Sequence, residues 1–305
     1  MQYTIRSGAY AAEVASVGAS LRALTHDGRD LVVPFAADEV RPAYRGATLA
    51  PWPNRIVDGR YTFDGAEHRA ALTEPERGHA LHGLVAWADF GLVAQSGDRV
   101  TLATVIPPQT GYPWRVRVET TYTVDAAGLT QSVRATNESP DAAPFGTGPH
   151  PYLVAGPAPL DEWTFQLDAA EVLEVDDRLA PVGLAACSGR FDWRAPRVLG
   201  AVELDHAFTG LGRADGIARA RLTDPSGTGV ELAWDASCPW VQVHTADLPT
   251  LPDGPGTPGH RAGLAVEPMT CAPDAFNAAR YDYDAGLLVI APGASVTASW
   301  RIAAL

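Results

Sequence analysis

The sequence predicts an all-β protein built from antiparallel sheets. Short runs in which apolar and polar residues alternate recur along all 305 residues, and turn dipeptides such as Asp-Gly separate neighbouring runs. No long segment keeps the 3.6-residue apolar period of an amphipathic helix. Consecutive hairpins without helices between them assemble as a stacked sandwich or as a closed barrel.

The individual hairpins are predicted from their turns. Asp27-Gly28 and Asp64-Gly65 each separate two short β-type runs, which is a strong local hairpin signal. A longer alternating pair turns at Gly128. In chain order, we expect strand pairs within residues 23–33, 60–72, 91–106, 116–137, 218–235 and 286–305.

The chain is expected to fold as one domain over residues 1–305, because no Ser/Gly-rich linker or shift in composition divides it. The alanine-rich segment 274–286 has room for one short helical turn. Residues 248–263 are rich in proline and glycine, which predicts a long surface loop. We expect this loop to be mobile and to border the functional cleft.

The charge of the chain narrows the classes of partner. Its 36 acidic residues outnumber 23 basic ones, for a net charge of −13, and every basic residue is an arginine. This excess of negative charge argues against nucleic acid or an anionic membrane surface as a partner. The absence of lysine excludes catalysis through a lysine Schiff base.

Cysteine usage and hydropathy predict a soluble cytoplasmic protein. Cys187, Cys238 and Cys271 are odd in number and far apart, so we expect buried free thiols in a reducing compartment. The first residues lack the basic patch and apolar run of a signal peptide. No stretch approaches about eighteen consecutive apolar residues, so no membrane span is expected.

One histidine is fixed between two prolines. In "GTGPHPYL", residues 146–153, Pro149 and Pro151 lock their own φ angles and bias Gly148 and His150 toward extended conformations. His150 is therefore held by a stiff backbone rather than by a helix. This arrangement fits either a rigid turn with an exposed imidazole or a proton-transfer group that is positioned in advance.

A carboxyl group, Glu267, closes an apolar run and precedes Pro268. Burial at the end of a strand would raise its pKa and make it a better base near neutral pH; a structural salt bridge is the alternative.

His79 and His82 would point to opposite faces of a strand, and no metal-binding motif accompanies them. We therefore expect no metal site.

Taken in order, the segments "NRIVDGRYTFDG", "LHG", "GPHPYL", "LDHAF" and "VEPMTCAPDAFN" resemble those of the aldose 1-epimerase (galactose mutarotase) family. The resemblance extends from about Pro51 to the C-terminus. It implies one large antiparallel β-sandwich and an isomerase that interconverts the anomers of a free aldose without metal or cofactor. It also implies that the partner is a small-molecule sugar; we expect a monomer or a homodimer.

The resemblance further implies a role for six residues. Glu267 would be the general base, His150 the general acid, and Asn54, Arg55, His82 and Asp205 would bind sugar hydroxyls. The base takes the proton of the C1 hydroxyl while the acid protonates the ring oxygen. The ring then opens to an aldehyde, the C1–C2 bond rotates, and closure on the other face gives the other anomer.

Three other functions stay open on the sequence. A hexose-6-phosphate 1-epimerase would need an arginine cluster for the phosphate, for which Arg41, Arg45 and Arg77 are candidates. A non-catalytic carbohydrate-binding protein could share the fold, and Asp205 with Glu267 could serve a glycosidase. The sequence has "VEPMT" where galactose-specific members commonly have Glu-x-Gln, and "LHGL" where they have "LHGG". The identity of the sugar therefore stays open.

Overall fold

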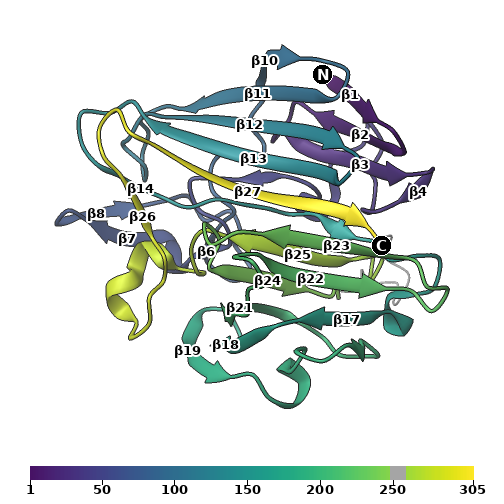
Figure 1. The fold of residues 1–305 in the computed structure, drawn as a ribbon. Coiled ribbons are helices and arrows are strands. Elements are labelled where there is room, and N and C mark those ends of the chain that lie inside the picture. Colours follow the sequence, from purple (N-terminus) through teal and green to yellow (C-terminus); the bar gives the residue numbers. More distant parts are fainter. Residues whose placement is uncertain (248–258) are drawn as a thin grey trace.

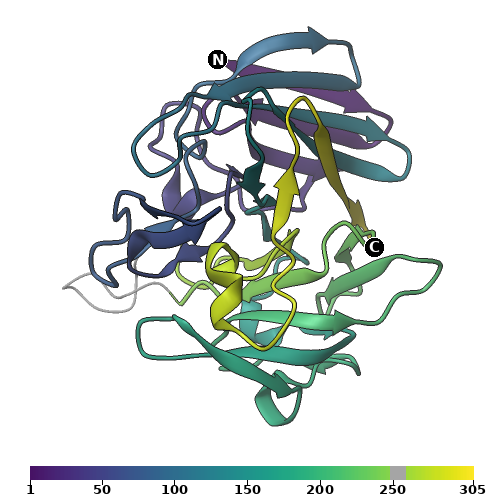
Figure 2. The same cartoon turned by 90° about the vertical axis from the view of Figure 1, so that its left-hand side faces the viewer.

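The computed structural model describes residues 1–247 and 259–305 and has a long antiparallel sheet covered by two smaller ones (Figure 1). At one end of the long sheet, β1 (Gln2–Ser7) and β2 (Tyr10–Ala15) contact three of its strands, β11 (Arg99–Ile106), β12 (Val116–Asp125) and β13 (Gly128–Asn137). The six-stranded sheet lies against the end that contains β22 (Ala218–Thr223) and β23 (Gly229–Trp234) (Figures 1 and 2). This arrangement confirms the predicted all-β antiparallel sandwich.

The sheets combine hairpins with pairings between strands that are distant in sequence. The nine-stranded sheet contains, in spatial order, β10 (Gly91–Gln95), β11 (Arg99–Ile106), β12 (Val116–Asp125), β13 (Gly128–Asn137), β27 (Ser295–Ala304), β23 (Gly229–Trp234), β22 (Ala218–Thr223), β17 (Thr164–Leu167) and β20 (Arg197–Val198). The six-stranded sheet contains β16 (Tyr152–Leu153), β25 (Leu264–Met269), β24 (Trp240–His244), β21 (Asp205–Leu211), β18 (Ala169–Val175) and β19 (Pro181–Ala186). The four-stranded sheet contains β1 (Gln2–Ser7), β2 (Tyr10–Ala15), β3 (Ser20–His26) and β4 (Arg29–Asp30).

Short elements complete the described part of the chain. The two-stranded pairs are β14 (Ala143–Phe145) with β26 (Leu288–Ile290), β15 (Gly148–Pro149) with β5 (Thr48–Leu49), β6 (Arg55–Ile56) with β9 (Ala80–Leu81), and β7 (Arg60–Phe63) with β8 (Ala66–Arg69). The 3-10 segments are η1 (Pro42–Tyr44), η2 (Val57–Gly59), η3 (Leu160–Glu162), η4 (Gly189–Phe191) and η5 (Ala275–Arg280). The last of these is the short helical turn that the alanine-rich segment predicted. None of the helices in the described ranges is long and apolar enough to cross a membrane.

Most of the predicted hairpins are present in the structure. Asp64 and Gly65 form the two-residue turn between β7 and β8, and both have positive φ angles (49° and 76°), as a type I′ turn requires. The final pair, within residues 286–305, was wrongly predicted as a hairpin. There β26 pairs with β14, whereas β27 pairs with β13 and β23. Pairing to strands distant in sequence outcompetes the local turn.

The core lies between the sheets. On β12 the buried side chains alternate from Val116 to Tyr122, so one face of the strand is apolar and the other is partly solvated. One continuous cluster of buried apolar residues extends from Tyr3 on β1 to Ile302 on β27. Because the sheets share this core, the polar side chains that project from the six-stranded sheet are held by a stiff frame.

Candidate active site

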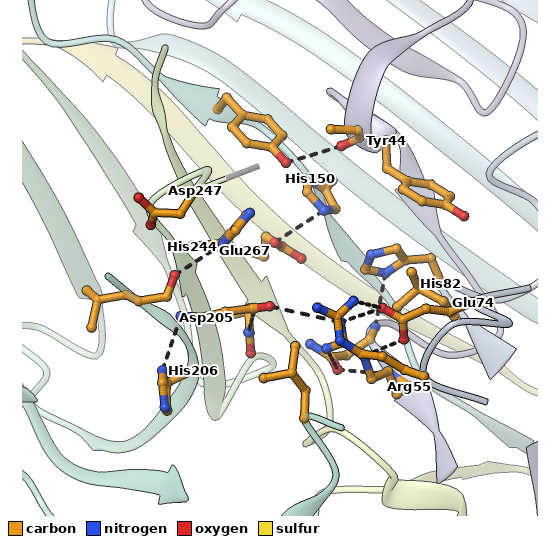
Figure 3. A pocket seen from close by; sticks show the side chains of 18 of the residues that line it. Tyr44, Arg55, Glu74, His82, His150, Asp205, His206, His244, Asp247 and Glu267 are labelled. Carbon is orange, nitrogen blue, oxygen red and sulfur yellow. Dashed lines mark hydrogen bonds and ion pairs between the residues drawn. The ribbon is translucent and has the colours of Figure 1, made fainter. Parts of the chain in front are cut away.

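One cavity brings the predicted site residues together (Figure 3). Its volume is about 420 Å³, and its lining includes all six of them: Asn54, Arg55, His82, His150, Asp205 and Glu267. Tyr44, Glu74, Gln242 and His244 also line it, although the sequence did not point to them. Gln242 and His244 alternate with valines in "WVQVH", so the period-2 pattern of β24 could have revealed both.

Regular strands form one side of the cavity, which we call the strand wall: Asp205, Gln242, His244 and Glu267. Asp205 on β21 lies opposite His244 on β24. Gln242 on β24 lies opposite Glu267 on β25. Residues two apart on a strand share a face, so all four side chains project from one face of the six-stranded sheet.

Turns form the other side, which we call the turn wall: Tyr44, Asn54, Arg55 and His82. Tyr44, Asn54 and His82 have φ angles of 56°, 55° and 60°, in the left-handed region that residues with a side chain seldom adopt. Such strain is maintained only where surrounding contacts enforce it, and it concentrates at functional sites. Leu179 and Ala43, which also line the cavity, share this conformation.

Arg55 is fixed by a buried carboxylate that the sequence did not reveal. Its Nε and Nη2 atoms donate to the two oxygens of Glu74 at 2.7 and 2.9 Å, and both side chains are more than nine-tenths buried. Arg77 Nη1 also donates to Glu74, at 2.9 Å. Burial acts to raise the pKa of Glu74, but the Arg55 guanidinium outweighs this effect and holds the pKa below its usual value. A bidentate pair of this kind sets the orientation of the guanidinium.

The tautomer of His82 follows from its contacts. The backbone N–H of Asn54 donates to His82 Nδ1 at 3.2 Å, which leaves the ring proton on Nε2. Burial lowers the pKa of His82 well below its ordinary value, and the charges of His150 and Arg55 act in the same direction. His82 is therefore a neutral side chain that can donate one hydrogen bond to a ligand hydroxyl.

His150 is buried and braced from both sides. β15 and β16 flank it and pair with β5 and β25, and its own carbonyl accepts a hydrogen bond from Gly46 N at 2.8 Å. Its ring stacks on Tyr152 at 5.2 Å between centroids and meets His82 edge-on at 5.0 Å. Because only 5% of His150 is exposed, the structure excludes the alternative of a solvent-facing imidazole on a rigid turn.

His150 and Glu267 face each other. His150 Nε2 lies 3.5 Å from Glu267 Oε1, and both side chains are buried. Burial raises the pKa of Glu267 well above its usual value, and the Asp205 carboxylate adds to this effect. Burial, followed by the nearby His244, lowers the pKa of His150 to about 3. Burial therefore favours the neutral form of each partner: the protonated carboxyl of Glu267 and the uncharged imidazole of His150.

Asp205 differs from Glu267 although both carboxylates border one cavity. Burial acts to raise its pKa, but His244, Arg55 and a hydrogen bond from Gln242 Nε2 (2.6 Å) outweigh burial and lower the pKa. Arg55 Nη2 lies 3.9 Å from its Oδ2 atom. Asp205 is thus an ionised acceptor. Glu267 Oε2 and Gln242 Oε1 are buried without a hydrogen-bond partner among the described residues, so they can accept from a ligand.

Other candidates from the sequence lie outside this cavity. His79 accepts from Asp58 N at 3.2 Å and contacts the Arg178 carbonyl at 3.0 Å, as a structural histidine does. Arg41 and Arg45 do not line the cavity either; their guanidinium groups donate to backbone carbonyls. Within residues 1–247 and 259–305, no cluster of three or more His, Cys, Asp or Glu could hold a metal ion. Most of the predicted loop, residues 248–258, lies outside the described residues.

The fold and the site define a class of protein: β-sandwiches in which a buried Glu–His pair lies in one cavity with arginine, asparagine and aspartate side chains. The chain belongs to the aldose 1-epimerase family, whose sequence profile matches residues 1–303. It is 35% identical to the uncharacterized protein YihR of Escherichia coli K12, over 90% of this chain and 85% of the relative. Galactose mutarotase of Bos taurus is 29% identical, over 90% of this chain and 86% of the relative. The crystal structure of a GalM/aldose epimerase homologue from C. elegans superposes with a TM-score of 0.86 at 22% identity, covering 100% of this chain and 98% of that one.

Proposed function

We propose that the protein is an aldose 1-epimerase that interconverts the α and β anomers of a free aldose. The observation that carries the proposal is the buried pair of Glu267 and His150, with 3.5 Å between Oε1 and Nε2, in a cavity lined by hydrogen-bonding side chains. Mutarotation needs one group to accept a proton and another to donate one to the same sugar, and this pair supplies both.

In the proposed reaction the Glu267 carboxylate takes the proton of the C1 hydroxyl while the His150 imidazolium protonates the ring oxygen. The bond between C1 and the ring oxygen breaks, and an open-chain aldehyde forms. After rotation about C1–C2, the ring oxygen attacks the other face of C1, and both protons return to their donors. Neither an oxidant nor a net proton enters the cycle.

The resting proton must first move within the pair. In the ligand-free site burial favours a protonated Glu267 and a neutral His150, the reverse of the distribution that starts the reaction. A C1 hydroxyl that donates to Glu267 stabilises the carboxylate form, and a ring oxygen near His150 stabilises the imidazolium. We infer that sugar binding shifts the shared proton from Oε1 to Nε2.

The remaining groups account for binding. Arg55 Nη1 and His82 Nε2 are donors, whereas the Asp205 carboxylate is an acceptor, so together they match the mixed character of sugar hydroxyls. The hexose 6-phosphate alternative has less support. Of its three candidate arginines only Arg77 lines the cavity, and Arg77 already donates to Glu74.

Polarimetry on freshly dissolved α-aldoses, with the spontaneous rate subtracted, tests the proposal. The panel contains galactose, glucose, xylose, arabinose and glucose 6-phosphate. We expect faster decay of rotation for at least one free aldose. Activity confined to the 6-phosphate would support the alternative, and binding of sugars without any acceleration would support a carbohydrate-binding protein. Release of reducing sugar from an aryl glycoside would indicate a glycosidase.

A further inference from the structure

A second cavity adjoins the candidate active site. Its volume is about 430 Å³, close to that of the first, and Tyr44 and Leu81 line both. The centroid of the Tyr44 ring lies 4.7 Å from that of His82 and 5.9 Å from that of Trp87. The two cavities are therefore neighbours that share Tyr44 of the turn wall.

The second cavity has an aromatic surface that is open to solvent. Trp87 is 53% exposed, an unusual state for an indole, and Leu81 and Leu84 border the same space. Nothing in the mechanism proposed above uses Trp87. An exposed aromatic side chain beside a sugar-sized cavity has the chemistry to stack on the apolar face of a pyranose.

Trp87 is also held in place. The Arg41 guanidinium lies 4.3 Å from its ring centroid. That guanidinium donates in turn to Ala86 O and Ser20 Oγ, both at 2.5 Å, and is itself buried. Burial lowers the pKa of Arg41 to about 10, which still leaves the group charged at neutral pH. These contacts restrict the indole, and such restriction lowers the entropy lost when a ligand stacks on it.

We propose that this second cavity binds the non-reducing ring of a reducing disaccharide, with Trp87 and Tyr44 as its stacking surface. The proposal rests on the proposed function, because the reducing ring would occupy the cavity of Glu267 and His150. Trp87 then determines substrate length and does not take part in the proton transfers.

The test compares one reducing ring with and without a second ring. Lactose, maltose and melibiose all carry glucose at the reducing end, joined through different linkages. Polarimetry gives kcat/KM for each disaccharide and for glucose. Dividing the disaccharide value by the glucose value measures the contribution of the second ring. In the Trp87→Ala variant we expect this ratio to fall roughly two- to tenfold for at least one disaccharide. The Trp87→Phe variant, which keeps an aromatic face, should retain most of it.

Leu92→Ala is the matched control, because Leu92 is a similarly exposed apolar residue (49%) on β10 and lines neither cavity. The ratio of disaccharide to glucose kcat/KM in Leu92→Ala should equal that of the wild type. Circular dichroism verifies that each variant is folded. If Trp87→Ala changes no ratio more than Leu92→Ala does, the second-ring site is wrong.

Calorimetry separates this outcome from failure of the proposed function. If the wild type accelerates no mutarotation, titration with the same three disaccharides still examines Trp87. Weaker binding of a disaccharide by Trp87→Ala than by Leu92→Ala supports the site. Equal binding by both variants, or no binding to the wild type, overturns it.

Discussion

The two walls of the cavity are built in opposite ways. On the strand wall, Glu267 and Gln242 occupy regular register positions of the six-stranded sheet, and the alternation of the strands alone directs them into the cavity. On the turn wall, Asn54 and His82 reach the same cavity only because the backbone adopts left-handed conformations that cost roughly 1–2 kcal/mol each. The proposed base is thus on the stiff frame, and much of the proposed sugar recognition is on strained turns.

The largest expected effect lies on the strand wall. Glu267→Gln keeps the shape of the side chain but cannot accept a proton, so kcat should fall about 10²- to 10⁴-fold with sugar affinity nearly unchanged. His150→Asn, at a residue outside the strand wall in the segment between β15 and β16, should lose a similar factor through the missing donor. Polarimetry gives kcat, and calorimetry gives the affinity. A Glu267→Gln enzyme that keeps more than about a tenth of wild-type kcat, a loss below ~1.4 kcal/mol, would show that the assigned base is wrong.

The turn wall should respond in both stability and binding. Glu74→Gln removes the carboxylate charge that faces the buried Arg55, so we expect the free energy of unfolding to fall by about 3–5 kcal/mol and KM to rise as kcat falls. Denaturant unfolding and polarimetry measure the two effects. Glu138→Gln is the control, because its ion pair with Arg115 is exposed and should contribute less than about 1 kcal/mol. Equal losses in the two variants would contradict the role of Glu74.

A pair of glycines tests whether the turn wall depends on close packing. Gly83 and Gly65 have similar φ angles of 72° and 76°, but only at position 83 would a Cβ atom collide with the Ala50 carbonyl. Gly65→Ala should cost about 1–2 kcal/mol through backbone strain alone. Gly83→Ala should cost more and also raise KM, because His82 precedes it. Thermal unfolding and KM check this, and an unchanged KM in Gly83→Ala would mean that the turn tolerates displacement.

The smallest perturbation is a change of pH, which leaves both walls intact. kcat/KM should stay level while the pair holds one proton. It should fall in acid as His150 takes up a second proton, near pH 3, and in alkali as Glu267 loses the only one, above its usual carboxyl range. The rate profile over pH 3–10 measures both limbs, within the range where the enzyme stays folded. An acid limb near 6.5, the ordinary value for an imidazole, would show that burial does not control His150.

The same contrast explains how much could be predicted from sequence. The strand positions and most hairpins follow from alternation and Asp-Gly turns, and the six residues predicted from the motifs all line the cavity. Glu74 carried no signal, because its partnership with Arg55 depends on a bridge between Glu74 and His79 that no periodicity encodes. Tyr44 was missed for a similar reason: its direction is set by a left-handed turn. The pairing of β27 required knowledge of strands more than sixty residues away.

The cations that line the cavity, Arg55, Arg77 and Arg190, have a consequence for chemical durability. The proposed ring-opened intermediate is a free aldehyde, which condenses readily with the primary amine of a lysine. A guanidinium is protonated and delocalised at neutral pH, so it binds hydroxyl oxygens without acting as a nucleophile. Since the sequence contains no lysine at all, no side-chain amine is present to become glycated by the enzyme's own intermediate.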